Sequence, residues 1–128
     1  MQFDHAGIAC EEIEPVAATF CAVLGVETVH EETLEQLRVH FLDLGNGYLE
    51  LLEPIEPDGP IATYLNRHGP GIHHLAFVTD DVETALDRAK EAGITTIDDE
   101  PRPGAWGHDV AFLHPRDMGG VLVEFVEH

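Results

Sequence analysis

The most constraining feature of this sequence is an internal repeat. Residues 5–14 (His-Ala-Gly-Ile-Ala-Cys-Glu-Glu-Ile-Glu) align without a gap with residues 74–83 (His-Leu-Ala-Phe-Val-Thr-Asp-Asp-Val-Glu). Each segment leads into a helix-like stretch that stops at a glycine, Gly25 in the first copy and Gly93 in the second. A repeat of about 69 residues is too long for a solenoid unit, so we expect one domain built from two copies of the same unit.

Each copy reads as a strand, a helix and three further strands. In the first half we expect strands at 3–9, 26–30, 37–44 and 48–53, and a helix from near Pro15 to Gly25. In the second half we expect strands at 72–78, 94–97, 110–114 and 121–126, and a helix led by Asp80 with Glu83 completing a capping box. A short helix is expected at 60–66, in the linker. The predicted fold class is α+β, as a single domain over 1–128 with βαβββ modules at about 1–58 and 70–128.

The composition is strongly acidic, with 25 Asp and Glu against 6 Lys and Arg, a net charge of −19. Nucleic acid is excluded as a partner, because a phosphate backbone requires basic patches. The acidic residues are spread along the chain, which favours a halophilic source over an acidic interaction tail, since high salt screens the self-repulsion. No leader pattern or long apolar run occurs, so we expect no membrane association and a cytoplasmic location. Cys10 and Cys21 are expected to be free thiols.

Side-chain alternation selects four candidate metal ligands. His5 and His74 occupy the same position in the two copies, each among apolar or small residues on its strand face. Glu50 and Glu124 interrupt otherwise apolar faces on the last strand of each half, where an ionised carboxylate needs a partner or a metal. Two imidazoles and two carboxylates suit Co²⁺, Mn²⁺, Zn²⁺, Ni²⁺ or Fe²⁺, and the lack of thiolates argues against a closed structural zinc site.

Each of these residues also has an ordinary structural explanation. A histidine on an apolar strand face can be a hydrogen-bonded core residue, and a strand glutamate can simply be exposed at an edge. His73 competes with His74, but the repeat aligns His74 with His5 and puts His73 on the opposite face. Among the other histidines, His114 is the one most expected to approach a site.

The sequence resembles the methylmalonyl-CoA epimerase family of the vicinal oxygen chelate (glyoxalase/bleomycin resistance/dioxygenase) superfamily over nearly its full length. The motifs that carry the resemblance are Asp4-His5-Ala6-Gly7-Ile8-Ala9, Leu44-Gly45-Asn46, Glu50-Leu51-Leu52-Glu53-Pro54, Pro60-Ile61-Ala62, Gly71-Ile72-His73-His74, and Phe112-Leu113-His114-Pro115-Arg116-Asp117 leading to Gly119-Gly120-Val121-Leu122-Val123-Glu124. The resemblance implies two βαβββ modules forming a curled mixed sheet around a metal, most often in a homodimer. It also implies His5, Glu50, His74 and Glu124 as ligands, with glutamine at the position of Glu50 in some members.

The activity implied by the resemblance is epimerisation of a small acyl-CoA substrate. A divalent metal, Co²⁺ first among the candidates, would stabilise the enolate left when the α-proton departs. Inversion requires an acid/base group on each face of the carbon, and Glu124 is the candidate for one of them. Several bacterial members use a glutamate for the other, at the position of Val39 in this chain, so the second group is unassigned. Coenzyme A is polyanionic, and Arg116 in the motif loop is a candidate to bind it.

Two other functions compete with this interpretation. The first is another metal-dependent enzyme of the fold, a glyoxalase-like isomerase or a dioxygenase. The second is a non-catalytic protein that binds a small molecule without a metal. The four intact ligand candidates argue against the binding protein, and the match through the final motif argues against the other enzymes.

Overall fold

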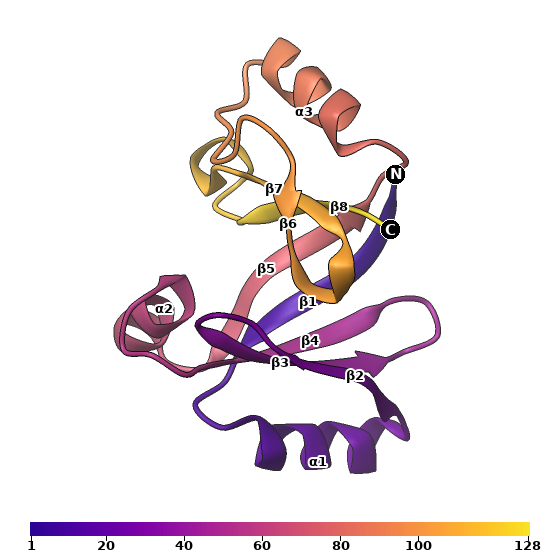
Figure 1. Cartoon of the computed structure of the whole chain (residues 1–128), viewed down its shortest axis with the longest axis vertical. Helices are drawn as coiled ribbons and strands as arrows, with labels where there is room; N and C mark the ends of the chain where they lie inside the picture. Colours follow the sequence, from indigo (N-terminus) through magenta and orange to yellow (C-terminus); the bar gives the residue numbers. More distant parts are fainter. The chain divides into compact units, whose positions relative to one another are not determined.

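The computed structural model describes residues 1–128, and its elements follow one order twice (Figure 1). The first half comprises β1 (Gln2–Ala9), α1 (Ile13–Leu24), β2 (Glu27–Thr33), β3 (Leu37–Asp43) and β4 (Tyr48–Pro54). The linker helix α2 (Pro60–His68) precedes β5 (Gly71–Val78), α3 (Val82–Glu91), β6 (Arg102–Pro103), β7 (Asp109–Leu113) and β8 (Val123–Glu127), with short 3-10 turns η1 (Ala105–Gly107) and η2 (Pro115–Asp117). The predicted α+β class and the βαβββ order of each half are confirmed.

The strands form a mixed sheet, as predicted, with hydrogen-bonded neighbours in the order β2-β3-β4-β1-β5-β8-β7-β6. In each half the first strand pairs in parallel with the last, β1 with β4 and β5 with β8. The remaining pairs within each half are antiparallel. Because the first strand lies beside the last, the candidate histidine and the candidate glutamate of each half come from neighbouring strands.

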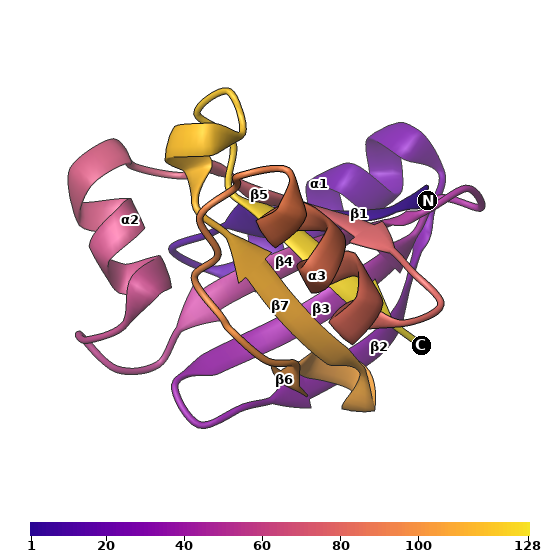
Figure 2. The same cartoon turned by 90° about the horizontal axis from the view of Figure 1, so that it is seen from above.

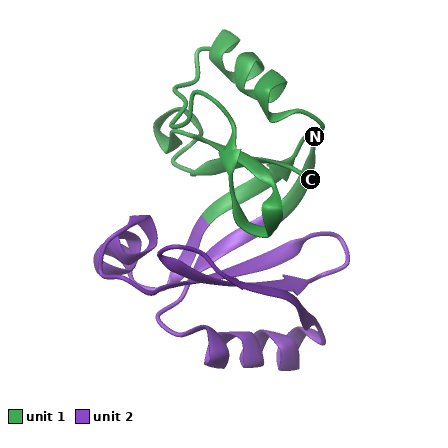
Figure 3. Cartoon of the chain, viewed as in Figure 1, with its two compact units in different colours: residues 1–4, 74–128 green, residues 5–73 purple.

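The chain divides into two compact units (Figure 3). Unit 1 comprises residues 1–4 and 74–128, and unit 2 comprises residues 5–73. β1 and β5 each continue from one unit into the other, because the boundaries fall within these strands. Each unit has its own buried apolar cluster. That the whole chain forms a single domain stays a prediction.

The core of unit 2 lies between α1 and one face of its strands. Ile13 and Ala17 project from the helix at a spacing of four residues and pack with Leu42 of β3 and Leu51 of β4. The helix begins two residues before Pro15 and stops at Gly25, as predicted, where a φ of +68° gives the left-handed conformation common at helix C-termini. The opposite face of the strands is therefore left for the candidate site.

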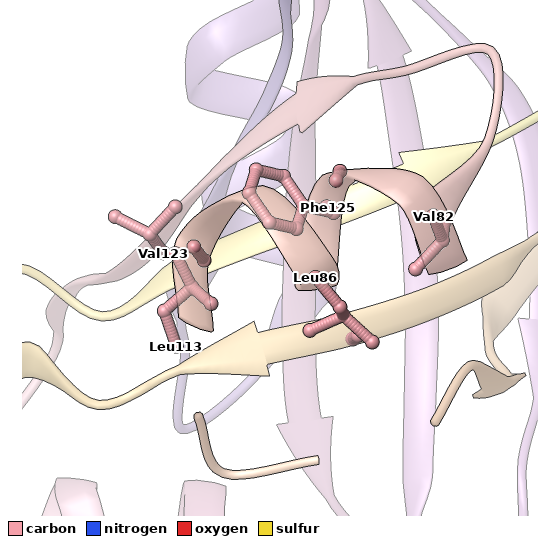
Figure 4. Close-up of a cluster of buried hydrophobic side chains, with 8 residues drawn as sticks. Val82, Leu86, Leu113, Val123 and Phe125 are labelled. Carbon is pink, nitrogen blue, oxygen red and sulfur yellow. The ribbon is translucent and has the colours of Figure 1, made fainter. Parts of the chain in front are cut away.

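The core of unit 1 is built in the same way around α3, which covers β7 and β8 (Figures 2 and 4). Val82 and Leu86 point from the helix toward Leu113, Val123 and Phe125, and all five are buried. Residues 123 and 125 share this face because strand side chains alternate. Residue 124, between them, must project to the other face.

The expected strand at 94–97 is wrong. Only an isolated bridge joins Thr96 to Leu113, and the strand that precedes β7 is β6, which lies between the expected strands at 94–97 and 110–114. Backbone bonds do run beside β7, from Ile97 N to Phe112 O at 2.8 Å. The ladder stops because the Asp98 carboxylate accepts the bond from Phe112 N, at 2.9 Å, which a strand carbonyl would otherwise accept.

The N-cap predicted for the second helix is shifted by one residue. Asp81, rather than Asp80, caps α3, and its Oδ1 accepts a bond from Glu83 N at 3.0 Å. Its Oδ2 also accepts from the hydroxyl of Thr84, at 2.9 Å. Glu83 therefore stands two residues after the cap, one too few for the reciprocal bond of a capping box.

Candidate metal centre

In unit 2, His5 and Glu50 form a buried pair on the face of the strands opposite α1. β1 and β4 pair in parallel with Gly7 beside Glu50, so the imidazole two residues before Gly7 projects to the same side as the carboxylate. Nε2 of His5 lies 3.1 Å from Oε1 of Glu50, and the two side chains are only 4% and 7% exposed. Phe41, the cross-strand neighbour of Glu50 on β3, packs edge-on against His5 with ring centroids 5.7 Å apart.

In unit 1, His74 and Glu124 form the corresponding pair. β5 and β8 pair in parallel with Ala76 beside Glu124, again two residues along from the histidine. Nε2 of His74 lies 3.0 Å from Oε1 of Glu124, with side chains 5% and 8% exposed. Phe112 is the cross-strand neighbour of Glu124 and packs edge-on against His74, with centroids 5.6 Å apart. The duplication thus produces a matched histidine, glutamate and phenylalanine in each unit.

The phenylalanines were missed by the sequence reasoning. Phe41 and Phe112 lie on the strand before each glutamate, and both precede a leucine that packs under a helix. That repeated Phe-Leu pair is a sequence signal that could have identified them. Their rings cover the imidazoles with apolar surface, so the pairs are shielded from water and their ring orientation is restricted.

The donor atoms of the two pairs suit a metal ion. His5, Glu50, His74 and Glu124 form a group of buried side chains in which each offers one ligand atom, and the group could hold a metal ion. A buried carboxylate is costly without a positive partner, and a divalent cation supplies one. No thiolate competes, because burial raises the pKa of the Cys10 thiol and keeps it protonated, with its Sγ 3.6 Å from Ile8 O.

A second glutamate in each unit connects the strand of the pair to the helix on the opposite face. Glu53 follows Glu50 by three residues, so it projects to the α1 side, where its Oε1 accepts a bond from Ile13 N at 2.8 Å. Glu127 follows Glu124 by the same interval and accepts from Val82 N at 2.9 Å. Each bond satisfies a backbone N–H in the first turn of a helix. The Glu-x-x-Glu spacing, repeated in the two halves of the sequence, is the signal that could have identified these two glutamates.

The remaining histidine candidates have other surroundings. His73 packs edge-on against Tyr64 of α2, with ring centroids 5.2 Å apart, and is not in the buried group. His114 is the N-cap of η2, where its Nδ1 accepts a bond from Arg116 N at 3.0 Å. The expectation that His114 approaches a site stays a prediction.

The comparisons with known proteins agree with this geometry. Residues 4–112 match the family model described as Glyoxalase/Bleomycin resistance protein/Dioxygenase superfamily. The chain is 39% identical to an ethylmalonyl-CoA/methylmalonyl-CoA epimerase of Cereibacter sphaeroides, covering 96% of this chain and 95% of that protein. It is 36% identical to the mitochondrial methylmalonyl-CoA epimerase of Homo sapiens, covering 96% of this chain and 72% of that protein.

A solved structure extends the likeness to the fold. The Streptomyces coelicolor methylmalonyl-CoA epimerase in complex with 2-nitronate-propionyl-CoA superposes with a TM-score of 0.93 at 37% identity, covering 99% of this chain and 94% of that one. The chain therefore belongs to the glyoxalase/bleomycin resistance protein/dioxygenase superfamily and, within it, to the family of methylmalonyl-CoA epimerases.

Proposed function

We propose that this protein is a methylmalonyl-CoA epimerase, an isomerase that interconverts the (R) and (S) forms of methylmalonyl-CoA through an enolate. The observation that carries the proposal is the matched, buried pair of histidine and glutamate in each unit. An isolated ligand could be incidental, but two pairs at equivalent positions in a duplicated chain supply a complete donor set. The named activities of the relatives supply the reaction.

The proposed ligands are His5, Glu50, His74 and Glu124, bound to one divalent ion. Co²⁺ is our first candidate, and Mn²⁺, Zn²⁺, Ni²⁺ and Fe²⁺ fit the same mixed nitrogen and oxygen donors. When bound, the ion supplies positive charge that favours the enolate over the neutral thioester. His5 and His74 must be neutral to act as ligands, so metal affinity should fall in acid.

The proposed role of Glu124 is to exchange the α-proton on one face of the substrate carbon. Its carboxylate takes the proton as the C–H bond breaks, and the electron pair of that bond passes to the thioester carbonyl. Phe112 and the surrounding apolar side chains exclude water from this carboxylate, which strengthens its electrostatic interaction with the reacting carbon.

Arg116 is the proposed contact for the anionic coenzyme A portion. Its Nη2 donates to the hydroxyl of Thr95 at 3.0 Å, and its side chain is 64% exposed. Asp117 beside it accepts a bond from Thr95 N at 2.8 Å, and this bond lowers the pKa of the Asp117 carboxyl. The turn is thereby held in place, with the guanidinium open to solvent.

Three further proposals concern the setting of this chain. We include a homodimer, a cytoplasmic location and adaptation to high salt, the last because a net charge of −19 is screened only by concentrated ions. No helix of the structure is long and apolar enough to cross a membrane. A melting temperature that does not rise between 0.1 and 2 M KCl would contradict the salt adaptation.

The function is tested by proton NMR in D₂O, with methylmalonyl-CoA and added Co²⁺ at high salt. We expect loss of the α-proton signal together with appearance of the other epimer. A folded, metal-loaded protein that leaves the α-proton unchanged would overturn the proposal. Purified protein that neither retains nor gains a divalent metal would instead favour a non-catalytic binding protein, and turnover of a glyoxalase or dioxygenase substrate alone would favour another enzyme of the superfamily.

A further inference from the structure

On the face of unit 2 that carries Glu50, the β3 residues nearest to this glutamate are apolar. In the β3 and β4 pairing, Phe41 lies opposite Glu50 and Val39 lies opposite Leu52. Val39 therefore shares the face of Glu50, and its side chain is fully buried and apolar. An epimerase needs a proton carrier on each side of the substrate carbon. β3 supplies none beside Glu50, since its one carboxylate on this face, Asp43, lies at the end of the strand and accepts a bond from Gly45 N at 2.7 Å.

The next strand, β2, places a carboxylate on the same face. In the β2 and β3 pairing, Glu32 lies opposite Val39 and His30 lies opposite Phe41. Directly opposed residues of antiparallel strands project to the same side, so Glu32 shares the face of Val39 and Glu50. Neighbouring strands are about 4.8 Å apart, so the carboxylate is displaced by about one such spacing from the position that Val39 occupies.

A bulge in β2 determines which glutamate takes this position. Thr28 pairs with Leu42, but the next pair is His30 with Phe41, so two residues of β2 oppose one residue of β3. Without the extra residue, Glu31 would lie opposite Val39 and Glu32 would project to the other side. With the bulge, Glu31 pairs with His40 on the α1 face, and its side chain is 65% exposed.

The surroundings of Glu32 suit proton transfer. Its Oε1 lies 3.2 Å from Nε2 of His30, and the two side chains are 25% and 27% exposed, so the pair is partly screened but still reaches water. His30 packs on Phe41 with ring centroids 6.1 Å apart, and Phe41 also packs on His5 of the proposed metal centre. Phe41 thus connects the Glu32 pair with the unit 2 half of that centre.

We propose that Glu32, hydrogen bonded to His30, is the second acid/base residue of the epimerase. This inference rests on the proposed function. It assigns to Glu32 the proton transfer that the side chain of Val39 cannot perform. In one direction the Glu32 carboxylate takes the α-proton, and the electron pair of the broken C–H bond moves onto the thioester carbonyl. That pair then returns to the carbon and forms the new C–H bond with the proton that protonated Glu124 gives to the opposite face. In the other direction the two glutamates exchange roles, and His30 passes the surplus proton between Glu32 and water.

The test compares Glu32→Gln with Glu31→Gln, an identical change one residue away on the other face. Each variant is loaded with Co²⁺ and given one pure epimer of methylmalonyl-CoA in D₂O, and inversion and α-proton exchange are followed separately. In Glu32→Gln we expect inversion to fall by about 10² to 10⁴-fold, with exchange kept for only one epimer, the one whose α-proton faces Glu124. Bound metal should stay at the parent level, and Glu31→Gln should invert the substrate at the parent rate.

A second variant tests the geometry. Adding Val39→Glu to Glu32→Gln returns a carboxylate to the same face on the adjacent strand, and we expect part of the inversion activity to return. Inversion by Glu32→Gln within threefold of the parent would overturn the assignment, as would equal losses in Glu31→Gln and Glu32→Gln. Failure of the parent protein itself to epimerise the substrate would instead overturn the proposed function, and this role of Glu32 with it.

Discussion

The two units repeat the same buried pair but differ in what surrounds it. Both place a histidine, a glutamate and a phenylalanine on one face of their strands, and both use a glutamate three residues later to bond the start of a helix. They differ at the strand farthest from the pair. β2 of unit 2 is a full strand, Glu27–Thr33, that carries His30 and Glu32, whereas β6 of unit 1 is only Arg102–Pro103 and carries no carboxylate.

This difference shows what duplication supplies and what divergence adds. A repeated unit directly provides equivalent donor groups for a metal centre. Epimerisation needs two proton carriers on opposite faces of one carbon, and these do not have to be equivalent. Unit 1 contributes Glu124, which is also a proposed ligand, while unit 2 contributes the separate carboxylate of Glu32 from a strand that unit 1 has reduced to two residues.

The largest expected effect comes from comparing the two buried glutamates directly. Glu124→Gln and Glu50→Gln each keep an amide oxygen that can bind a metal, but glutamine cannot carry the α-proton. For the epimer whose α-proton faces Glu124, we expect Glu124→Gln to lower the exchange rate by about 10³-fold or more and Glu50→Gln to lower it by about 10-fold. Exchange in D₂O measures both, with circular dichroism as the folding control. Equal losses would contradict the separate catalytic role of Glu124.

Next in size is the loss of metal when either histidine is removed. If one ion is shared by both units, His5→Ala and His74→Ala should each lose nearly all bound Co²⁺, with affinity falling by at least about 10-fold to 100-fold. His73→Ala, beside the ligand but packed on Tyr64, is the matched control and should keep parent metal content. Retention of about half the metal in both ligand variants would mean that each unit binds its own ion.

The sequence predicted the buried histidine and glutamate pairs better than the groups around them, for a physical reason. His5, Glu50, His74 and Glu124 follow from strand alternation and from the repeat, and both are properties of the sequence itself. Glu32 depends on the pairing of β2 with β3 and on a bulge between Thr28 and His30, which no spacing along the chain reveals. The strand expected at 94–97 is absent because the side chain of the next residue, Asp98, accepts the bond from Phe112 N that a strand carbonyl would otherwise accept.

A smaller expected effect distinguishes the two helix starts. Glu53 supports the start of α1 alone, because the side chain of the N-cap residue, Glu12, makes no cap bond. Glu53 also accepts a bond from Arg38, and Arg38 pairs with Glu14 as well. That pairing lowers the pKa of Glu14 to about 2. Because Glu53 bonds both the helix start and Arg38, we expect Glu53→Ala to lower the free energy of unfolding by about 2 kcal/mol.

In unit 1, Glu127 shares the support of its helix with Asp81. Glu127→Ala should cost about 1 kcal/mol, less than Glu53→Ala, because the Asp81 cap remains. Urea denaturation measures both changes, and Glu12→Ala is the control that should leave the midpoint unchanged. A larger loss in Glu127→Ala than in Glu53→Ala would show that the local cap does not compensate.

The smallest expected effect is the pH dependence of the Asp81 cap. Bonds from Thr84 and Glu83 lower the pKa of Asp81, so its charged form is favoured in the folded protein. The contribution of that charge is complete above the unfolded pKa of about 3.9 and is lost as the pH falls through the lower folded value. We expect Asp81→Asn to lower Tm at pH 6, with the difference from the parent narrowing below about pH 4, while Asp80→Asn changes Tm little at either pH. Calorimetry across this range measures the effect. A deficit that stays constant down to pH 2.5 would show that Asp81 supports α3 by geometry alone, without any contribution from its charge.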